Sequence, residues 1–284
     1  MNVKIAAVVV TYNRKTMLEK NFNAIQAQSR KPDALIVVDN HSTDGTEQWI
    51  AQSGFLQAPH FYYLRLDENL GASGGFYEGI KYGVKQGFDW IWGMDDDAIP
   101  EQDALEKLNY YANLNPNACY YSNPDNDQDG YNGDIKEVDH WMFVGFFINR
   151  AVVEKVGLPR KDFFIYQDDF EYAHRIRKAG FKILKVRTSI IHHQDYSQQK
   201  IRTGRFLGKS YSFPVMNDWK IYYLTRNRLL AFSFREIGKY RAYIGVWRKV
   251  GIPLLATNPK QFSAFLKGYV HGVLGKSGKL LNPE

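Results

Sequence analysis

Short apolar runs alternate with amphipathic segments through the first third of the chain. The apolar runs are rich in β-branched and aromatic residues, which predicts strands at Ile5–Val10, Ala34–Val38, Phe61–Leu66 and Phe88–Met94. Between them, apolar residues recur at helical spacing and predict helices at Thr16–Gln28, Thr43–Gln52 and Ser73–Gln86. This alternation predicts an α/β fold, in which helices cover both faces of a mostly parallel sheet.

The rest of the chain carries the same signals less regularly. We expect helices at Pro100–Asn113 and Asp168–Ala179, and strands at Met142–Asn149, Ile183–Val186 and Ser189–Ile191. From Trp219 onward, apolar and aromatic residues interleave with cations, which predicts three amphipathic helices. We therefore expect an α/β domain over residues 1–215 and a C-terminal helical region over residues 216–284.

Polar residues follow each of the first four predicted strands. The four groups are Thr11-Tyr12-Asn13-Arg14, Asp39-Asn40, Asn69-Leu70-Gly71 and Asp95-Asp96-Asp97. Ligands of open α/β sheets bind outside the carboxyl ends of the strands. We expect the four groups to converge on one rim of the sheet, where the ligand binds.

The three consecutive aspartates from Asp95 to Asp97 are the most informative feature of the chain. Carboxylates packed this closely repel one another unless a cation lies among them. They suit Mg²⁺ or Mn²⁺, which in turn bind phosphate oxygens. The alternative is an acidic loop that caps the next helix. His192 follows a short apolar strand and is either a further metal ligand or a structural histidine.

A second acidic group, Asp168-Asp169, opens a predicted helix. The helix dipole stabilises negative charge there, so these residues either cap the helix or supply a general base near the cation. A glycine cluster at Gly71–Gly75 follows the third strand, where it either admits an anion or allows close helix packing. The glycine fingerprint of dinucleotide-binding proteins should follow the first strand instead, which argues against that class.

Composition and charge narrow the classes further. The formal net charge is +7, which favours anionic partners, and the cations dominate from Lys178 onward. Cys119 is the only cysteine, which excludes an intrachain disulfide. The first strand lacks the features of a signal peptide, and no uncharged apolar run reaches the length of a membrane span. We therefore expect any membrane contact to be peripheral.

Taken together, the motifs resemble inverting family-2 glycosyltransferases of the GT-A fold. The resemblance rests on Val8–Arg14 and Val37–Thr46, followed in order by the aspartate triplet and the acid pair, and it covers roughly Val3 to His193. It implies a Rossmann-like GT-A catalytic domain over residues 1–215, of the nucleotide-diphospho-sugar transferase kind. A narrower resemblance, in Glu68–Phe76 and Tyr166–Tyr172, is to bacterial galactofuranosyltransferases. It implies UDP-galactofuranose as the donor and cell-surface polysaccharide as the product.

The resemblance also implies a role for each motif residue. The residues implied to bind the nucleotide sugar are Thr11, Tyr12, Asn13, Arg14, Asp39, Asn69, Gly71, Gly74, Asp95 and Asp96. The residues implied to hold a divalent cation, Mn²⁺ or Mg²⁺, are Asp95, Asp97 and His192. Asp169 is the implied catalytic base, with Asp168 as the fallback. For the acceptor we expect contacts from Trp141, Arg226 and Arg228.

Three alternatives stay open at this stage. A rhamnosyl or other hexosyl transferase would share the same frame. A Mg²⁺-dependent nucleotidyltransferase also uses paired carboxylates, but no glycine- and lysine-rich triphosphate loop follows the first strand. A nucleic-acid binder is suggested by the charge alone, and because no known motif accompanies the charge we expect no nucleic-acid partner.

The amphipathic C-terminal region suggests where the acceptor lies. Its cations and aromatic residues suit the interface of an anionic membrane. We expect a cytoplasmic protein held peripherally at the inner face of the cell membrane, with a lipid-linked glycan as acceptor. The alternatives are a helical appendage that packs on the catalytic domain, or a contact within a homo-oligomer.

Overall fold

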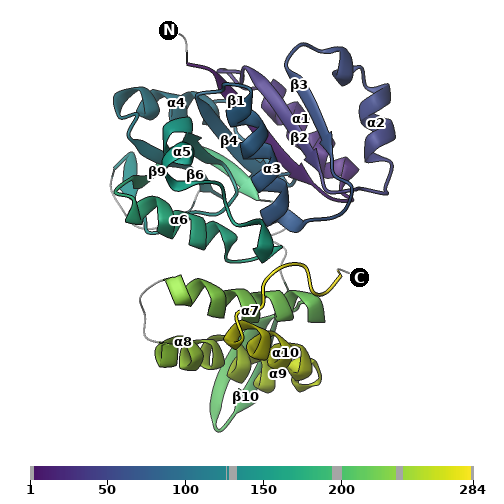
Figure 1. Cartoon of the computed structure of the whole chain (residues 1–284), viewed down its shortest axis with the longest axis vertical. Helices are drawn as coiled ribbons and strands as arrows, with labels where there is room; N and C mark the ends of the chain where they lie inside the picture. Colours follow the sequence, from purple (N-terminus) through teal and green to yellow (C-terminus); the bar gives the residue numbers. More distant parts are fainter. Residues whose placement is uncertain (1–2, 126, 128–132, 194–199, 235–238, 283–284) are drawn as a thin grey trace.

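The computed structural model describes residues 3–125, 127, 133–193, 200–234 and 239–282. A sheet with helices on both sides forms the upper part of the molecule, and a smaller helical region lies below it (Figure 1). The C-terminal tail runs back between the two parts. The expected α/β architecture is confirmed.

Nine strands form one large sheet in the order β3-β2-β1-β4-β8-β6-β9-β5, with β7 beside β9. Their bounds are β1 Ile5–Thr11, β2 Ala34–Asp39, β3 Phe61–Arg65, β4 Trp90–Asp95, β5 Ala98–Pro100, β6 Ala118–Pro124, β7 Ile135–Glu137, β8 Phe146–Asn149 and β9 Lys182–His193. Strands β1 to β4 run parallel, β8 is antiparallel to β4 and β6, and β9 returns parallel to β6. The mostly parallel half therefore brings its carboxyl ends to one rim.

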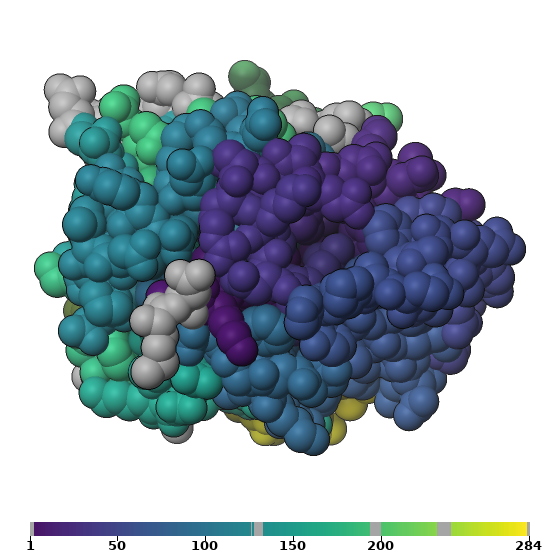
Figure 2. Space-filling model, turned by 90° about the horizontal axis from the view of Figure 1, so that it is seen from above, coloured from purple at the N-terminus to yellow at the C-terminus, as the bar shows by residue number. Residues whose placement is uncertain are grey.

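Six helices pack on this sheet: α1 Lys15–Gln26, α2 Thr46–Gln52, α3 Gly71–Lys85, α4 Ala104–Leu114, α5 Arg150–Val156 and α6 Asp168–Lys178. All seven residues of β1 are buried, as expected for a strand covered on both faces. Val9 joins one core cluster with Leu18 and Phe22 of α1, and Val8 joins the other with residues of α3. In the view from above, residues of the N-terminal half form most of the visible surface (Figure 2).

Glycines let α3 lie directly against the sheet. A Cβ atom at Gly75 would come within 2.4 Å of the Val10 side chain, and one at Gly79 within 2.4 Å of the Val8 side chain. Real side chains do not tolerate such distances, so the spacing of four residues between these glycines is a packing stripe. The glycine-rich start of α3 is held close to the end of β1 as a result.

The C-terminal region contains a hairpin that the hydrophobic pattern did not predict. Strands β10 Ile201–Phe206 and β11 Lys209–Pro214 precede helices α7 Asp218–Phe234, α8 Lys239–Val246, α9 Ile252–Thr257 and α10 Phe262–Val273. A π-helical turn at Trp247–Gly251 joins α8 to α9. A Cβ atom at Gly204 would meet the Ala256 carbonyl at 1.9 Å, so the hairpin packs tightly on the end of α9. This hairpin precedes the expected boundary at residue 216 but lies with the helices (Figure 1).

None of the helices within the described ranges combines the length and the apolar character needed to cross a bilayer.

Candidate active site

The polar groups at the ends of β1, β2 and β4 and at the start of α3 meet on one rim, as the sequence predicts. Thr11 lies in register with Asp39, and Val10 with Asp95. Thr11 Oγ1 donates a hydrogen bond of 2.7 Å to Asp96 Oδ2. Asn40 joins β2 to the start of α3, because its Nδ2 donates to the Gly71 carbonyl at 3.2 Å.

The residues expected around the nucleotide differ in accessibility. Tyr12 and Asn13 are exposed, and Asn13 Oδ1 accepts a hydrogen bond of 2.7 Å from the Thr43 amide. Asp39 is completely buried and accepts hydrogen bonds from the Ser42 amide and the Tyr63 hydroxyl. Burial, together with this contact to Asp39, raises the pKa of Tyr63 well above its usual range. The Tyr63 hydroxyl therefore stays a hydrogen-bond donor to Asp39.

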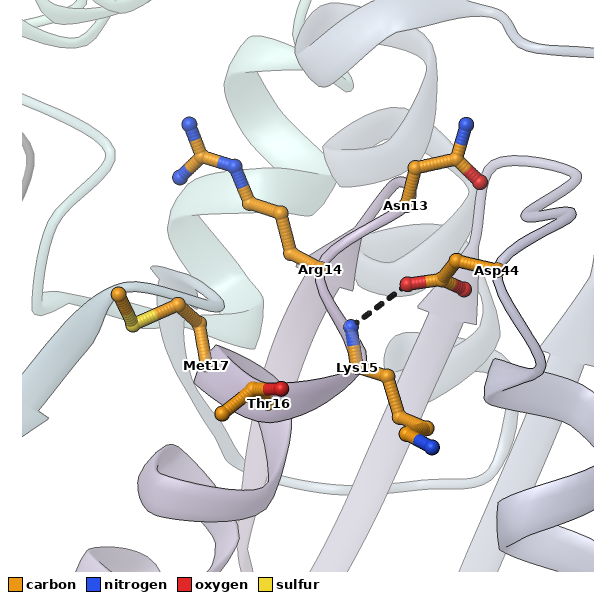
Figure 3. Close-up of a pocket in the computed structure, with 6 residues that line it drawn as sticks. All are labelled: Asn13, Arg14, Lys15, Thr16, Met17 and Asp44. Carbon is orange, nitrogen blue, oxygen red and sulfur yellow. Dashed lines mark hydrogen bonds between the residues drawn. The ribbon is translucent and has the colours of Figure 1, made fainter.

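An open pocket of about 320 Å³ lies at the start of α1. The lining residues are Asn13, Arg14, Lys15, Thr16, Met17 and Asp44. Asp44 Oδ2 accepts a hydrogen bond of 2.8 Å from the Lys15 amide, and the Arg14 guanidinium extends away from Asp44 (Figure 3). The Arg14 side chain instead reaches the acidic triplet.

The glycine cluster forms a turn that no other residue type could adopt. Gly71 has a φ of +72°, and a Cβ atom there would lie 2.0 Å from the Phe164 carbonyl oxygen. A Cβ atom at Gly74 would meet the Leu70 side chain at 2.3 Å. Asn69 holds the turn, since its Oδ1 accepts a hydrogen bond of 2.8 Å from the Gly71 amide. Of the two interpretations of these glycines, close packing is the one that these contacts account for.

The acidic triplet, Asp95 to Asp97, carries a compact set of ligand atoms. One oxygen each from Asp95 and Asp97 and one ring nitrogen of His193 all lie within 4.8 Å of one another. Arg14 Nη1 lies 2.9 Å from Asp97 Oδ2 and 3.5 Å from Asp96 Oδ1. Two carboxylates and an imidazole form a donor set that suits a divalent cation.

The three aspartates of the triplet differ in the direction in which their pKa values are shifted. Burial and the charge of Asp97 raise the pKa of Asp95 well above its usual range. Burial likewise raises the pKa of Asp96 to about 7, against the opposing charge of Arg14. Burial also acts to raise the pKa of Asp97, but a hydrogen bond from His193 and the charges of His193 and Arg14 bring it below its usual range. A bound cation would relieve the repulsion that raises the pKa of Asp95.

The imidazole beside the triplet is His193, which corrects the expectation of His192. Successive side chains of a strand point to opposite faces, so two adjacent histidines on β9 cannot both face the carboxylates. His193 Nε2 lies 3.4 Å from Asp97 Oδ1, whereas His192 Nε2 lies 3.4 Å from Glu101 Oε1. His192 is therefore outside the cluster.

The acid pair, Asp168 and Asp169, opens α6 as expected. Asp168 Oδ2 accepts a hydrogen bond of 2.8 Å from Ser73 Oγ, which ties it to the glycine turn. Asp169 Oδ1 accepts a hydrogen bond of 2.7 Å from the Phe170 amide. Burial raises the pKa of Asp168 to about 6. Burial and the charge of Asp168 raise the pKa of Asp169 to about 8.

Two of the three residues expected to contact an acceptor are enclosed, and this corrects the role assigned to them. Trp141 has no exposed surface and packs in the core against Phe146. Arg226 is also completely buried and donates to the carbonyls of Asp162, Phe163 and Gly278. Arg228 is half-buried, and burial lowers its pKa. Aromatic and basic residue types alone do not distinguish core and structural roles from a binding surface.

The sequence motifs gave no role to Ser73 and pointed to His192 in place of His193. Ser73 stands in the glycine cluster, where it reads as a turn residue until its bond to Asp168 is seen. The adjacent histidines could have been distinguished only with the register of β9 against β5, in which His193 pairs with Ala98.

Comparisons with known proteins agree with this geometry. The sequence model for glycosyl transferase family 2 matches residues 6–182. Galactofuranosyltransferase GlfT1 of Mycolicibacterium smegmatis is 29% identical over 203 residues, which cover 62% of this chain and 66% of that protein. The low-salt glycan biosynthesis hexosyltransferase Agl10 of Haloferax volcanii is 21% identical and covers 97% of this chain and 92% of that protein.

Solved structures support the same fold. A mannosyltransferase from Pyrobaculum calidifontis, solved in complex with GDP-Man and Mn²⁺, superposes with a TM-score of 0.63. The superposition covers 97% of this chain and 88% of that one, at 14% identity. At this identity, the likeness establishes the GT-A type of fold alone.

Proposed function

The chain belongs to glycosyltransferase family 2, and we propose that it is a metal-dependent, inverting galactofuranosyltransferase. In this proposal the donor is UDP-galactofuranose and the acceptor is a lipid-linked glycan. The product would be a cell-surface polysaccharide. The observation that carries the proposal is the pairing of a cation-binding set, Asp95, Asp97 and His193, with a separate acid pair that Ser73 ties to the same rim. The similarity to a galactofuranosyltransferase supports the choice of sugar.

Asp95, Asp97 and His193 would hold the cation in this proposal. When bound, a divalent cation would supply the positive charge that neutralises the leaving diphosphate. The mixed oxygen and nitrogen donors favour Mn²⁺ over Mg²⁺, because imidazole is a poor partner for Mg²⁺. The structural neighbour solved with Mn²⁺ supports this choice.

Asp169 is the proposed base. Its raised pKa, at about 8, suits a carboxylate that must take a proton from an acceptor hydroxyl near neutral pH. Its carboxylate accepts a hydrogen bond from the Phe170 amide, whereas the Asp168 carboxylate accepts one from the Ser73 hydroxyl. Attack of that hydroxyl on the anomeric carbon breaks the bond to the diphosphate in one displacement, which inverts the anomeric centre.

The donor side of the rim would be formed by the exposed Tyr12 and Asn13, the Arg14 guanidinium and the pocket at the start of α1. Asp39 would bind the nucleobase of the donor only if its contacts with Tyr63 and Ser42 made room, because its side chain is completely buried. Asp96 would contact the donor sugar.

A panel of nucleotide sugars tests the donor. The panel is UDP-galactofuranose, UDP-galactose, dTDP-rhamnose and GDP-mannose, each with Mn²⁺ and with EDTA. We expect turnover of UDP-galactofuranose alone, lost in EDTA, and thermal stabilisation by UDP but not by dTDP. A second candidate, another hexosyl transfer, is favoured by the near-complete coverage of the Agl10 hexosyltransferase, and turnover of a different donor would select it.

We further propose that the protein attaches peripherally to the inner face of the cell membrane. Residues 201–284 contain 15 lysines and arginines against three acids, a formal charge of +12, whereas residues 1–200 carry −5. Helices α8 and α10 expose Tyr240, Ile244, Leu266 and Val270 beside these cations. Apolar side chains flanked by cations are what an anionic lipid surface binds.

Flotation with anionic liposomes tests this attachment. Neutralising the exposed Arg241, Arg248 and Lys249 should weaken binding by roughly 100-fold, since each cation near an anionic surface is worth about 1 kcal/mol. The matched control neutralises three exposed lysines of the α/β part, Lys20, Lys31 and Lys85, and should leave binding unchanged. If the unaltered protein stays in the bottom fraction and none of it floats with the liposomes, the attachment is refuted.

A further inference from the structure

The segment that leads into α6 has an unusual backbone. Phe164, Tyr166 and Gln167 all have positive φ angles, of 68°, 67° and 67°. Phe164 also has a ψ of −60°, and the Ile165 amide donates to the Phe163 carbonyl at 2.9 Å, which is the strained form of γ-turn. Residues other than glycine pay about 1–3 kcal/mol for each such conformation, so the surroundings must hold this segment in place.

One buried side chain from the C-terminal region forms hydrogen bonds to three residues of this segment. Asn227 of α7 has no exposed surface, and its Nδ2 donates to the carbonyls of Phe163, Ile165 and Tyr166 at 2.8, 2.6 and 3.0 Å. The two hydrogens of this amide are thus aimed at three carbonyl oxygens, all within the strained segment. An asparagine that served only to satisfy its own helix would not converge on a loop more than 60 residues away.

Arg226 fixes the orientation of this amide. Its Nε donates to Asn227 Oδ1 at 2.8 Å, and its Nη2 donates to the Phe163 carbonyl at 3.0 Å. Its guanidinium also stacks on the Tyr223 ring at 4.7 Å. With its oxygen occupied by Arg226, Asn227 can present only its Nδ2 donors to the loop.

The opposite side of the segment rests on the glycine turn. The Phe164 carbonyl accepts a hydrogen bond of 3.2 Å from the Ser73 amide, and Gly71 leaves room for this carbonyl. Ser73 Oγ in turn holds Asp168. The segment is therefore bound on one side by α3 and on the other by α7, directly before the first residues of α6.

We propose that Asn227 is a positioning residue for Asp169. Asn227 holds the 163–167 segment in its strained form, and this fixes the direction in which the start of α6 presents the Asp169 carboxylate. The proposal rests on the assignment of Asp169 as the base under the proposed function. It gives the C-terminal region a part in the transfer step that is separate from any contact with membrane or acceptor.

The test compares Asn227→Ala with the unaltered full-length protein, and with Thr225→Val as the matched control. Thr225 is also completely buried on α7, but among the described residues its hydroxyl bonds only to the Ile221 carbonyl of its own helix. Two readouts are needed: hydrogen–deuterium exchange of peptides over residues 160–170, and kcat and donor KM with any donor that the unaltered protein turns over. If Asn227→Ala does not fold, Asn227→Ser replaces it.

We expect Asn227→Ala to raise exchange in residues 160–170 and to lower kcat by roughly 10- to 100-fold, with donor KM changed less than about twofold. Thr225→Val should change neither readout. In an Asp169→Asn background, Asn227→Ala should cause no further loss, because a residue that acts only through Asp169 has nothing left to position.

Unchanged exchange, or a normal kcat despite faster exchange, would overturn the proposal. An equal further loss in the Asp169→Asn background would overturn it as well. Failure of the proposed donor is distinguishable, since the exchange arm needs no donor and the kinetic arm uses whichever donor is active.

Discussion

The acidic triplet and the acid pair are both clusters of carboxylates whose pKa values are shifted by burial, but only the triplet has positively charged neighbours. The triplet has Arg14 and His193 within 3.5 Å of its oxygens. Within the described part of the chain, no lysine or arginine forms an ion pair with Asp168 or Asp169, and Asp168 is held by the Ser73 hydroxyl and by backbone amides at the start of α6. In the triplet, which we call the compensated cluster, the charges of Arg14 and His193 offset the burial of Asp97, although not that of Asp95 and Asp96. In the acid pair, which we call the uncompensated cluster, no such charge offsets burial.

These surroundings explain how one rim can support two kinds of chemistry. Nearby cations keep the pKa of Asp97 low, so this carboxylate stays ionised and available to a metal. Burial without a cation raises the pKa of Asp169 to about 8, so this carboxylate gains and loses a proton in the range where enzymes work. The proposed roles follow from the environments rather than from the residue type.

The largest effect should come from Asp97→Ala, which removes a ligand from the compensated cluster. Charge stabilisation by a metal is worth several kcal/mol, so we expect at least about a 1,000-fold loss of kcat/KM. Transfer assays with Mn²⁺ measure it. His193→Ala should also lose activity, while the adjacent His192→Ala, whose ring lies beside Glu101, should remain near normal. Full activity of Asp97→Ala would refute the metal assignment.

Asp169→Asn tests the uncompensated cluster. Loss of a general base lowers the rate by roughly two to four orders of magnitude, and binding of UDP should persist because the triplet is intact. Single-turnover rates and UDP titration separate the two quantities. If Asp168→Asn is inactive and Asp169→Asn is nearly normal, the roles of the two aspartates are exchanged.

How far the sequence predicted this site depended on whether the relevant contact is local. Strands β1 to β4, the rim and both acidic clusters follow from periodicity and spacing, which are local properties, whereas β5, β6 and β7 were not predicted. The choice of His193 over His192 required the register of β9, and the burial of Trp141 and Arg226 required tertiary packing. Hairpin β10–β11 escaped prediction because its residues are mostly exposed, so burial leaves no apolar pattern in the sequence.

The pH dependence of the rate gives a smaller but sharper test of the comparison. The base must be ionised, so kcat/KM should rise roughly tenfold per pH unit below a midpoint near the raised pKa of Asp169, about 8. Asp168→Asn should move this midpoint to lower pH, because it removes a neighbouring charge that raises the pKa. An unchanged midpoint in Asp168→Asn would mean that the two carboxyls titrate independently.

The last expected effect is on stability rather than on activity. The pKa of Asp169 is raised from 3.8 to about 8 on folding, so its contribution to stability is fully present below about pH 4 and is lost as the pH rises through about 8. The asparagine in Asp169→Asn cannot ionise. The melting temperature of this variant minus that of the unaltered protein should therefore be higher at pH 8.5 than at pH 5. About three pH units of this interval lie below the raised pKa, and each is worth about 1.4 kcal/mol, so we expect a gain of roughly 10 °C at about 2–4 °C for each kcal/mol. Differential scanning fluorimetry at both pH values measures it.

Asp162→Asn is the control of opposite sign for this measurement. Burial acts to raise the pKa of Asp162, but hydrogen bonds from Arg160 and Ser277 bring it below 3.8, so its contribution is present above about pH 4 and is lost as the pH falls below that. Asp162→Asn should therefore be less stable than the unaltered protein at both pH 5 and pH 8.5, by a nearly constant amount. If Asp169→Asn showed the same constant loss, its carboxyl would be compensated by charge as that of Asp97 is, and the contrast between Asp97 and Asp169 would fail.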